Sequence, residues 1–131
     1  MESGAQPLRC VIVDDNPTFL DAAAKFLGRE GITVVGVAST SAEALDCLAQ
    51  LKPDVTIVDV DLGGESGFEL AGRLTGGAVS SAVILTSTHS EQEFDDMILA
   101  SPALGFVPKV ALSPDAIRGL LDGRGQPSRE P

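Results

Sequence analysis

The chain has 131 residues, which suits one domain with a sizeable core and excludes a large multidomain enzyme. Hydrophobic residues make up 44% and charged residues 21%, a composition typical of a folded protein and not of a disordered one. Nine basic and nineteen acidic residues give a formal net charge of −10, which repels phosphate backbones and anionic lipids. We therefore expect protein, cation or small-ligand partners, with no direct nucleic-acid contact and no membrane contact.

Targeting signals and cysteine motifs are both missing from the sequence. The first residues carry no signal-peptide pattern, and no apolar run approaches the roughly 18 residues of a membrane span. Cys10 and Cys47 form no metal-ligand motif and no disulfide framework, so both thiols are expected to be buried and reduced. These features predict a cytoplasmic location.

Short apolar runs rich in β-branched residues predict five strands, and the runs lie at residues 8–13, 33–37, 55–58, 82–85 and 104–107. Most of these runs lack polar alternation, which is typical of strands buried on both faces of a parallel sheet.

Helical patterns alternate with the strands, and four of them have recognisable starts: Asp15 or Asn16 with Pro17, Thr40 with Glu43, Ser66 with Glu69, and Ser113 with Pro114. The first helix is expected to stop at Gly28. The fourth, at about 91–99, is the least well defined because Pro102 and Gly105 crowd its exit. The alternation predicts one α/β domain over 8–122, an N-terminal extension at 1–7, and a polar, disordered tail at 123–131.

Polar residues gather at the carboxyl ends of four predicted strands, where a doubly wound sheet binds its ligands. They are Asp14, Asp15, Asp59, Thr86 and Lys109. Three carboxylates in one crevice repel each other unless a cation lies among them, and an all-oxygen cluster suits Mg²⁺. Lys109 adds a second positive charge and Thr86 a hydroxyl donor, so the set can hold a tetrahedral anion. Each residue alone has a structural explanation, such as helix capping for Asp14 and Asp15, but their joint placement favours a functional site.

This ordered set resembles the response-regulator receiver domain of bacterial two-component signalling. The resemblance covers about 8–121 and rests on four motifs: Asp14-Asp15, Val58-Asp59-Val60-Asp61, Leu85-Thr86-Ser87 and Phe106-Val107-Pro108-Lys109. It implies a doubly wound α/β fold, (βα)5, whose five parallel strands follow the flavodoxin-like order 2-1-3-4-5.

The resemblance also implies roles for the acidic residues. Asp59 would be the phosphoacceptor. Asp15 would bind Mg²⁺ directly and Asp14 through water, with Asp59 and the backbone carbonyl of Asp61 completing the protein ligands.

Three further residues take roles from the resemblance. Lys109 would pair with the phosphoryl group, and Thr86 would bind a phosphoryl oxygen and report phosphorylation by moving inward. Phe106 occupies the switch-aromatic position, although burial alone also explains a phenylalanine there.

Partners follow from the same resemblance. A histidine kinase or phosphotransfer protein would supply the phosphoryl group, a downstream protein effector would read it, and dimerisation on phosphorylation stays open. The only reactions catalysed would be the domain's own phosphorylation and dephosphorylation. Val110 follows Lys109 where many receivers carry proline, and the stretch 105–113 looks closer to receivers joined to LuxR-type helix-turn-helix domains.

Two other functions remain open from the residues. Asp59-Val60-Asp61 has the D-x-D spacing of haloacid-dehalogenase-like phosphatases, although that family carries the motif on its first strand and two strands precede it here. A degenerate receiver that serves only as a binding scaffold is disfavoured by the intact acidic pair, Asp59 and Lys109. The single histidine, His89, is expected to be an exposed loop residue.

Overall fold

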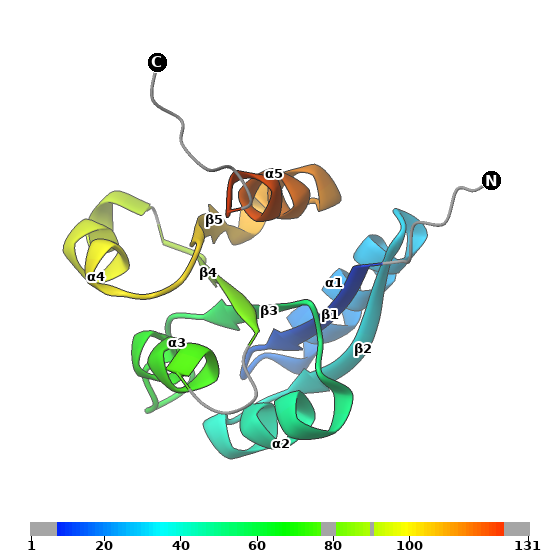
Figure 1. The fold of residues 1–131 in the computed structure, drawn as a ribbon, viewed down its shortest axis with the longest axis horizontal. Helices are drawn as coiled ribbons and strands as arrows, with labels where there is room; N and C mark the ends of the chain where they lie inside the picture. Colours follow the sequence, from blue (N-terminus) through cyan, green and yellow to red (C-terminus); the bar gives the residue numbers. More distant parts are fainter. Residues whose placement is uncertain (1–7, 77–80, 90, 125–131) are drawn as a thin grey trace.

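A computed structural model describes residues 8–76, 81–89 and 91–124. Its centre is a five-stranded parallel sheet (Figure 1), whose strands are β1 (Leu8–Val13), β2 (Ile32–Ala38), β3 (Val55–Asp59), β4 (Ala82–Ser87) and β5 (Gly105–Pro108). The strand order is β2-β1-β3-β4-β5, which confirms the predicted order 2-1-3-4-5.

Helices cover both faces of the sheet and are α1 (Pro17–Arg29), α2 (Ser41–Leu51), α3 (Gly67–Gly76), α4 (Asp95–Ala100) and α5 (Pro114–Arg124). Two short 3₁₀ turns, η1 (Glu91–Phe94) and η2 (Lys109–Ala111), precede α4 and α5. Within the described ranges, no helix is long and apolar enough to cross a membrane.

The core consists of two layers separated by the sheet. Successive side chains of a strand point to opposite faces, so Cys10 and Ile12 of β1 pack toward α1 and α5 while Val11 and Val13 pack toward α2 and α3. Every residue of β3 is buried. Because both faces are occupied by core, polar side chains from the central strands can gather only at the strand ends.

The first helix begins as its sequence indicates but ends later. The Asn16 side chain accepts hydrogen bonds from the backbone N–H groups of Thr18 and Phe19, so Asn16 is the cap and the carboxylates before it are not needed for capping. The expected stop at Gly28 is wrong, because the helix continues to Arg29 and the chain turns at Gly31, whose φ of 94° favours glycine.

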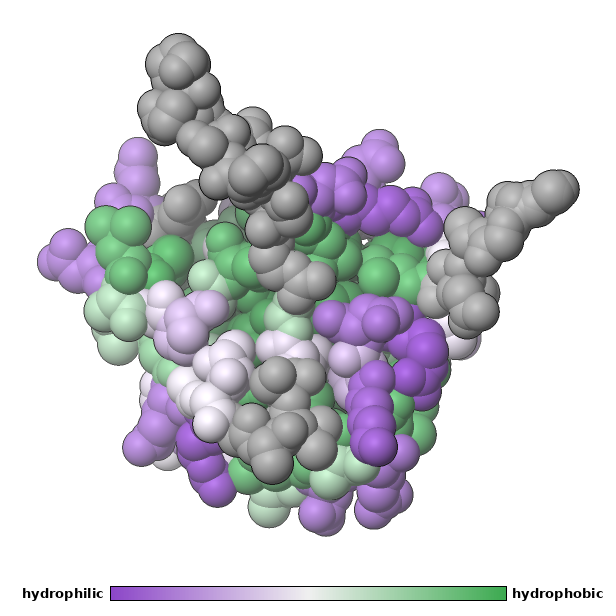
Figure 2. Space-filling view, in the orientation of Figure 1, coloured by the Kyte–Doolittle hydropathy of each residue, from purple (hydrophilic) through white to green (hydrophobic). Residues whose placement is uncertain are grey.

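The fourth helix also differs from its prediction as one helix over 91–99. Its first turn is η1 and only Asp95–Ala100 is α-helical, and Phe94 and Ile98 are the residues of this segment that pack against the core. No residue of α4 is buried, and Met97 and Leu99 are 51% and 84% exposed. Figure 2 shows the resulting hydrophobic surface over α4 at the left of the view.

The end of the last helix and the burial of one cysteine differ from what the sequence predicts. Helix α5 extends to Arg124, two residues past the expected boundary at 122, while 1–7 and 125–131 lie outside the described residues. Cys10 is buried, which raises the pKa of its thiol to about 12. Cys47 is only half-buried, so its expected burial is wrong.

Gly67 lets α3 approach the end of β3 closely. Its N–H donates to the carbonyl oxygen of Val60 at 2.9 Å, and a Cβ at this position would overlap the carbonyl oxygen of Asp59. Gly72, on the same helix, has open space where a Cβ would lie.

We predict opposite effects of the same substitution at these two glycines. Gly67→Ala should lower the free energy of unfolding by about 1–3 kcal/mol because the backbone of β3 must shift. Gly72→Ala should raise it by about 0.5–1 kcal/mol because alanine is the better helix former. Urea denaturation measures both, and a shift of the same sign in the two variants would contradict the close packing of α3 on β3.

Candidate functional site

The carboxylates of Asp14, Asp15 and Asp59 converge at the carboxyl edge of the sheet. Asp14 directly follows β1 and Asp59 ends β3, and the pairing of Val13 with Val58 in these adjacent strands sets the two aspartates side by side. Each of the three offers a carboxylate oxygen, and these atoms all lie within 4.8 Å of one another. Asp14 is fully buried and Asp59 is 6% exposed, whereas Asp15 is exposed.

Lys109 is the cation of this cluster. It follows β5 directly, and its Nζ lies 2.6 Å from Asp14 Oδ2 and 3.2 Å from Asp59 Oδ2. Its side chain is only 12% exposed, so these ion pairs are screened less than surface pairs. Burial alone would lower the pKa of Lys109, but the two carboxylates outweigh burial and raise that pKa above its ordinary value. The ammonium therefore stays charged.

The site still carries an excess of negative charge. Burial raises the pKa of Asp59, the charge of Asp14 adds to this effect, and the N–H of Asp61 and the Lys109 ammonium oppose it. Asp14 Oδ1 accepts a hydrogen bond from Asn16 N–H at 2.8 Å. Its buried Oδ2 forms the ion pair with Lys109, but within the described residues no donor is oriented to make a hydrogen bond to it. Two carboxylates thus share the Lys109 ammonium, and an oxygen of the Asp15 carboxylate lies within 4.8 Å of both.

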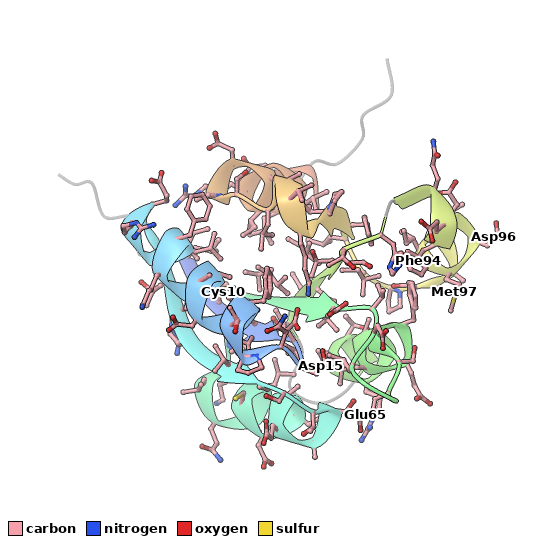
Figure 3. The ribbon with its side chains drawn as sticks, turned by 180° about the vertical axis from the view of Figure 1, so that it is seen from behind. Cys10, Asp15, Glu65, Phe94, Asp96 and Met97 are labelled. Carbon is pink, nitrogen blue, oxygen red and sulfur yellow. The ribbon has the colours of Figure 1, made fainter. Side chains whose placement is uncertain are left out.

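Hydrogen bonds to the side chains of Asp59 and Asp61 hold the loop after β3 in place. The N–H of Asp61 donates to Asp59 Oδ1 at 3.1 Å, and the Asp61 carboxylate accepts from the N–H of Gly63 at 3.2 Å. The Asp61 side chain is exposed and holds the loop instead of joining the carboxylate cluster. Glu65, labelled with Asp15 in Figure 3, ties the loop to α2, because its Oε1 accepts from Ser41 N–H at 2.8 Å.

Gly63 is a site residue that the sequence analysis missed. Its φ is 63°, and a Cβ there would lie 2.6 Å from Asp15 Oδ2. The signal was the Gly63-Gly64 pair in the loop after β3, which indicates a turn.

Thr86 lies on β4, the strand next to the one that carries Asp59, and Phe106 lies on β5. Thr86 pairs with Asp59 in the sheet, but its buried hydroxyl donates to the carbonyl oxygen of Val107 at 2.6 Å. The structure therefore does not bring this hydroxyl to the carboxylate cluster. The Phe106 ring is buried and lies 6.2 Å, centroid to centroid, from the ring of Phe94.

Phe19 of α1 is a second residue that the analysis missed. Lys109 Nζ lies over its ring, 4.3 Å from the centroid. In the sequence, Phe19 looks like an ordinary member of the apolar stripe of a helix, so nothing local indicated this contact.

A hollow of about 610 Å³ adjoins the site between the loop after β3 and η1–α4. Its lining includes Asp61, Glu65, Phe68, His89, Phe94 and Met97, of which Glu65, Phe94 and Met97 are labelled in Figure 3. His89 is an exposed loop residue as expected, and its ring meets Phe94 edge-on.

The sheet order and the acidic edge with its lysine define a signalling domain of the receiver class. The family model of the response regulator receiver domain matches residues 10–121. The chain belongs to this family, and receiver domains of this kind are signalling domains of two-component systems, not enzymes.

Individual relatives agree with the family. The chain is 30% identical over 123 residues to a Mycobacterium tuberculosis protein named "Probable transcriptional regulatory protein NarL", covering 92% of this chain and 57% of that protein. It is 30% identical over 115 residues to the positive alginate biosynthesis regulatory protein of Pseudomonas aeruginosa, covering 86% of this chain and 46% of that protein. The chain thus spans about half the length of the curated relatives it matches.

A solved structure gives the same result. The signal receiver domain of NarL from Mycobacterium tuberculosis is 27% identical, covers 93% of this chain and 100% of its own, and superposes with a TM-score of 0.79. The phosphatase hypothesis is not supported, because the D-x-D motif lies after the third strand and the Asp61 carboxylate is bonded within its own loop.

We predict that Lys109 holds this edge of the fold together in metal-free buffer. Lys109→Met should lower the free energy of unfolding by more than about 1 kcal/mol because it leaves buried carboxylates without a counter-charge. Lys25→Met, which removes an exposed pair with Asp21, should change it by about 0.5 kcal/mol or less. Equal effects of the two substitutions in urea denaturation would contradict the electrostatic role of Lys109.

Proposed function

We propose that this chain is a phosphoryl-accepting receiver, switched by Mg²⁺-dependent phosphorylation of Asp59 by a histidine kinase or phosphotransfer protein. The observation that carries the proposal is the cluster itself: Asp59 lies within 4.8 Å of Asp14 and Asp15, and Lys109 lies 3.2 Å from Asp59 Oδ2. Family membership supports it further.

The residues present fit Mg²⁺. Their donors are all oxygens, one oxygen of each carboxylate lies within 4.8 Å of the others, and the carboxylates outnumber the nearby cation. In the proposed site Asp15, Asp59 and the backbone carbonyl of Asp61 would hold the ion directly, and Asp14 would hold it through water. Bound Mg²⁺ would neutralise charge on the oxygens of the transferred phosphoryl group.

The proposed chemistry is an in-line phosphoryl transfer. A carboxylate oxygen of Asp59 forms a bond to phosphorus as the bond between phosphorus and the donor breaks, and the donor leaves with the electron pair. The Lys109 ammonium compensates charge on the phosphoryl oxygens, and the N–H of Asp61 keeps the Asp59 side chain oriented. Later attack by water on phosphorus releases phosphate and restores the carboxylate.

The proposed output is a change on β4 and β5. A phosphoryl group adds about −1.5 to −2 charge. Thr86 leaves the carbonyl of Val107 and binds a phosphoryl oxygen, and the movement reaches Phe106 on the neighbouring strand. These changes alter contacts with a downstream protein effector, and a dimer that forms on phosphorylation is one form of that output.

The setting of this function follows from the relatives and the charge. The Mycobacterium tuberculosis relative is named as a probable transcriptional regulatory protein, so the effector proposed here controls transcription. The net charge of −10 disfavours nucleic-acid contact by this chain itself. We propose that a chain with this phosphoryl donor and effector works in the cytoplasm, and that its receiver domain extends from residue 8 to the end of α5.

We predict the phosphorylation pattern of three proteins. Acetyl phosphate with Mg²⁺ should add one base-labile phosphoryl group to the wild type and to Asp61→Asn, and none to Asp59→Asn, because only Asp59 is the nucleophile. Intact-mass spectrometry measures the product, and EDTA should prevent its formation.

Two outcomes would contradict the proposal. An unmodified wild-type chain in the presence of Mg²⁺ would favour a binding scaffold. Rapid turnover of p-nitrophenyl phosphate by the wild type, lost in Asp61→Asn, would show a phosphatase.

We predict that Thr86 separates acceptance of the phosphoryl group from its consequences. Thr86→Ala should still accept a phosphoryl group but lose most of the response at Phe106, because the hydroxyl that moves is missing. Thr86→Ser retains the hydroxyl and should respond. Backbone NMR shifts on adding beryllofluoride, a mimic of the aspartyl phosphate, measure the response, and a full wild-type response in Thr86→Ala would refute the role of the hydroxyl.

A further inference from the structure

The Lys109 ammonium is enclosed by two different kinds of group. On one side lie the carboxylates of Asp14 and Asp59, and on another lies the ring of Phe19, 4.3 Å from Nζ to the ring centroid. The Lys109 side chain is 12% exposed, so most water is excluded from it. The family match and the sequence motifs account for the carboxylates and leave the ring unexplained.

The Phe19 ring attracts the Lys109 ammonium in a way that differs from a carboxylate. An aromatic face attracts a cation through its quadrupole and offers no strong hydrogen-bond acceptor. It can therefore hold the ammonium in place without competing for the N–H donors that a phosphoryl oxygen needs. An aliphatic side chain of similar size would fill the space but would not attract the charge.

Asn16 connects the backbone of Phe19 to the carboxylate cluster. The N–H of Asn16 donates to Asp14 Oδ1 at 2.8 Å, and the Oδ1 of Asn16 accepts from the N–H of Phe19 at 3.3 Å. One cap thus links the backbone that carries the ring to a carboxylate that binds the same ammonium.

We propose that Phe19 is a positioning residue for phosphoryl transfer, which holds the Lys109 ammonium at the oxygens of the incoming phosphoryl group through the face of its ring. This inference rests on the proposed phosphorylation of Asp59 and adds to it a residue of α1 that acts through Lys109.

The test compares the same substitution at two positions of α1. Phe19→Leu should slow the initial phosphorylation of Asp59 by acetyl phosphate roughly 3-fold to 30-fold, which corresponds to losing a partly desolvated cation–π contact. Phe26→Leu is the matched control, because Phe26 lies on the same helix and is 39% exposed. It should leave the rate at the wild-type value.

A conservative variant separates positioning from packing. Phe19→Tyr retains the aromatic face and should restore the rate to within about twofold of the wild type. The rates are measured at saturating Mg²⁺, so that a change in Mg²⁺ affinity does not enter the comparison. If urea denaturation shows that Phe19→Leu is not folded, Phe19→Met replaces it in the same comparison.

A second readout does not depend on phosphorylation. The chain has three lysines, Lys25, Lys52 and Lys109, so ¹³C-labelled lysine gives three sets of side-chain NMR signals. The ε-methylene signal of Lys109 should be shifted upfield by the ring in the wild type and in Phe19→Tyr, and should return to the usual position in Phe19→Leu.

The outcomes distinguish the two levels of inference. A wild-type chain that takes no phosphoryl group would overturn the proposed function, and the positioning role with it. A phosphorylated wild type with an equal rate in Phe19→Leu, or an unshifted Lys109 signal, would overturn the role of Phe19 and leave the function standing. A slow Phe19→Tyr variant would show that packing, not the aromatic face, sets the rate.

Discussion

Electrostatic repulsion at the carboxyl edge of the sheet is the constraint on which the rest of the site depends. Two carboxylates that are almost fully removed from water, Asp14 and Asp59, share one ammonium, and a third carboxylate lies within reach of both. Such an arrangement costs free energy unless positive charge is held close to it. The fold supplies that charge from β5 and retains an excess of negative charge suited to a divalent ion.

The carboxylates gather at this edge because helices cover both faces of the sheet. Helices cover both faces, so the central strands present polar side chains only where they end. Parallel pairing then brings those ends to one edge, and the register sets Asp59 beside Thr86. From that edge the hydrogen bond from the Thr86 hydroxyl to the carbonyl oxygen of Val107 links β4 to β5, and the proposed response to phosphorylation uses this link.

Much of the fold could be predicted from the sequence, because its signals are local. Apolar runs that end in Asp14, Asp59 or Thr86 mark buried strands, and their alternation with capped helices indicates a parallel sheet. Local signals failed where tertiary packing decided. The helix at 17–29 passes Gly28 because nothing there requires a positive φ. The segment at 91–100 divides into η1 and α4, and of its residues only Phe94 and Ile98 pack against the core.

The sequence by itself determined which charged residues stand at the strand ends, since strand boundaries and residue types are read along the chain. Only the tertiary structure decided where their side chains go. Gly63 lies against Asp15, the Thr86 hydroxyl turns to Val107, and the Phe19 ring covers Lys109. Each of these contacts joins segments far apart in the sequence, so it exists only once the packing of helices and loops on the sheet fixes the distance between them.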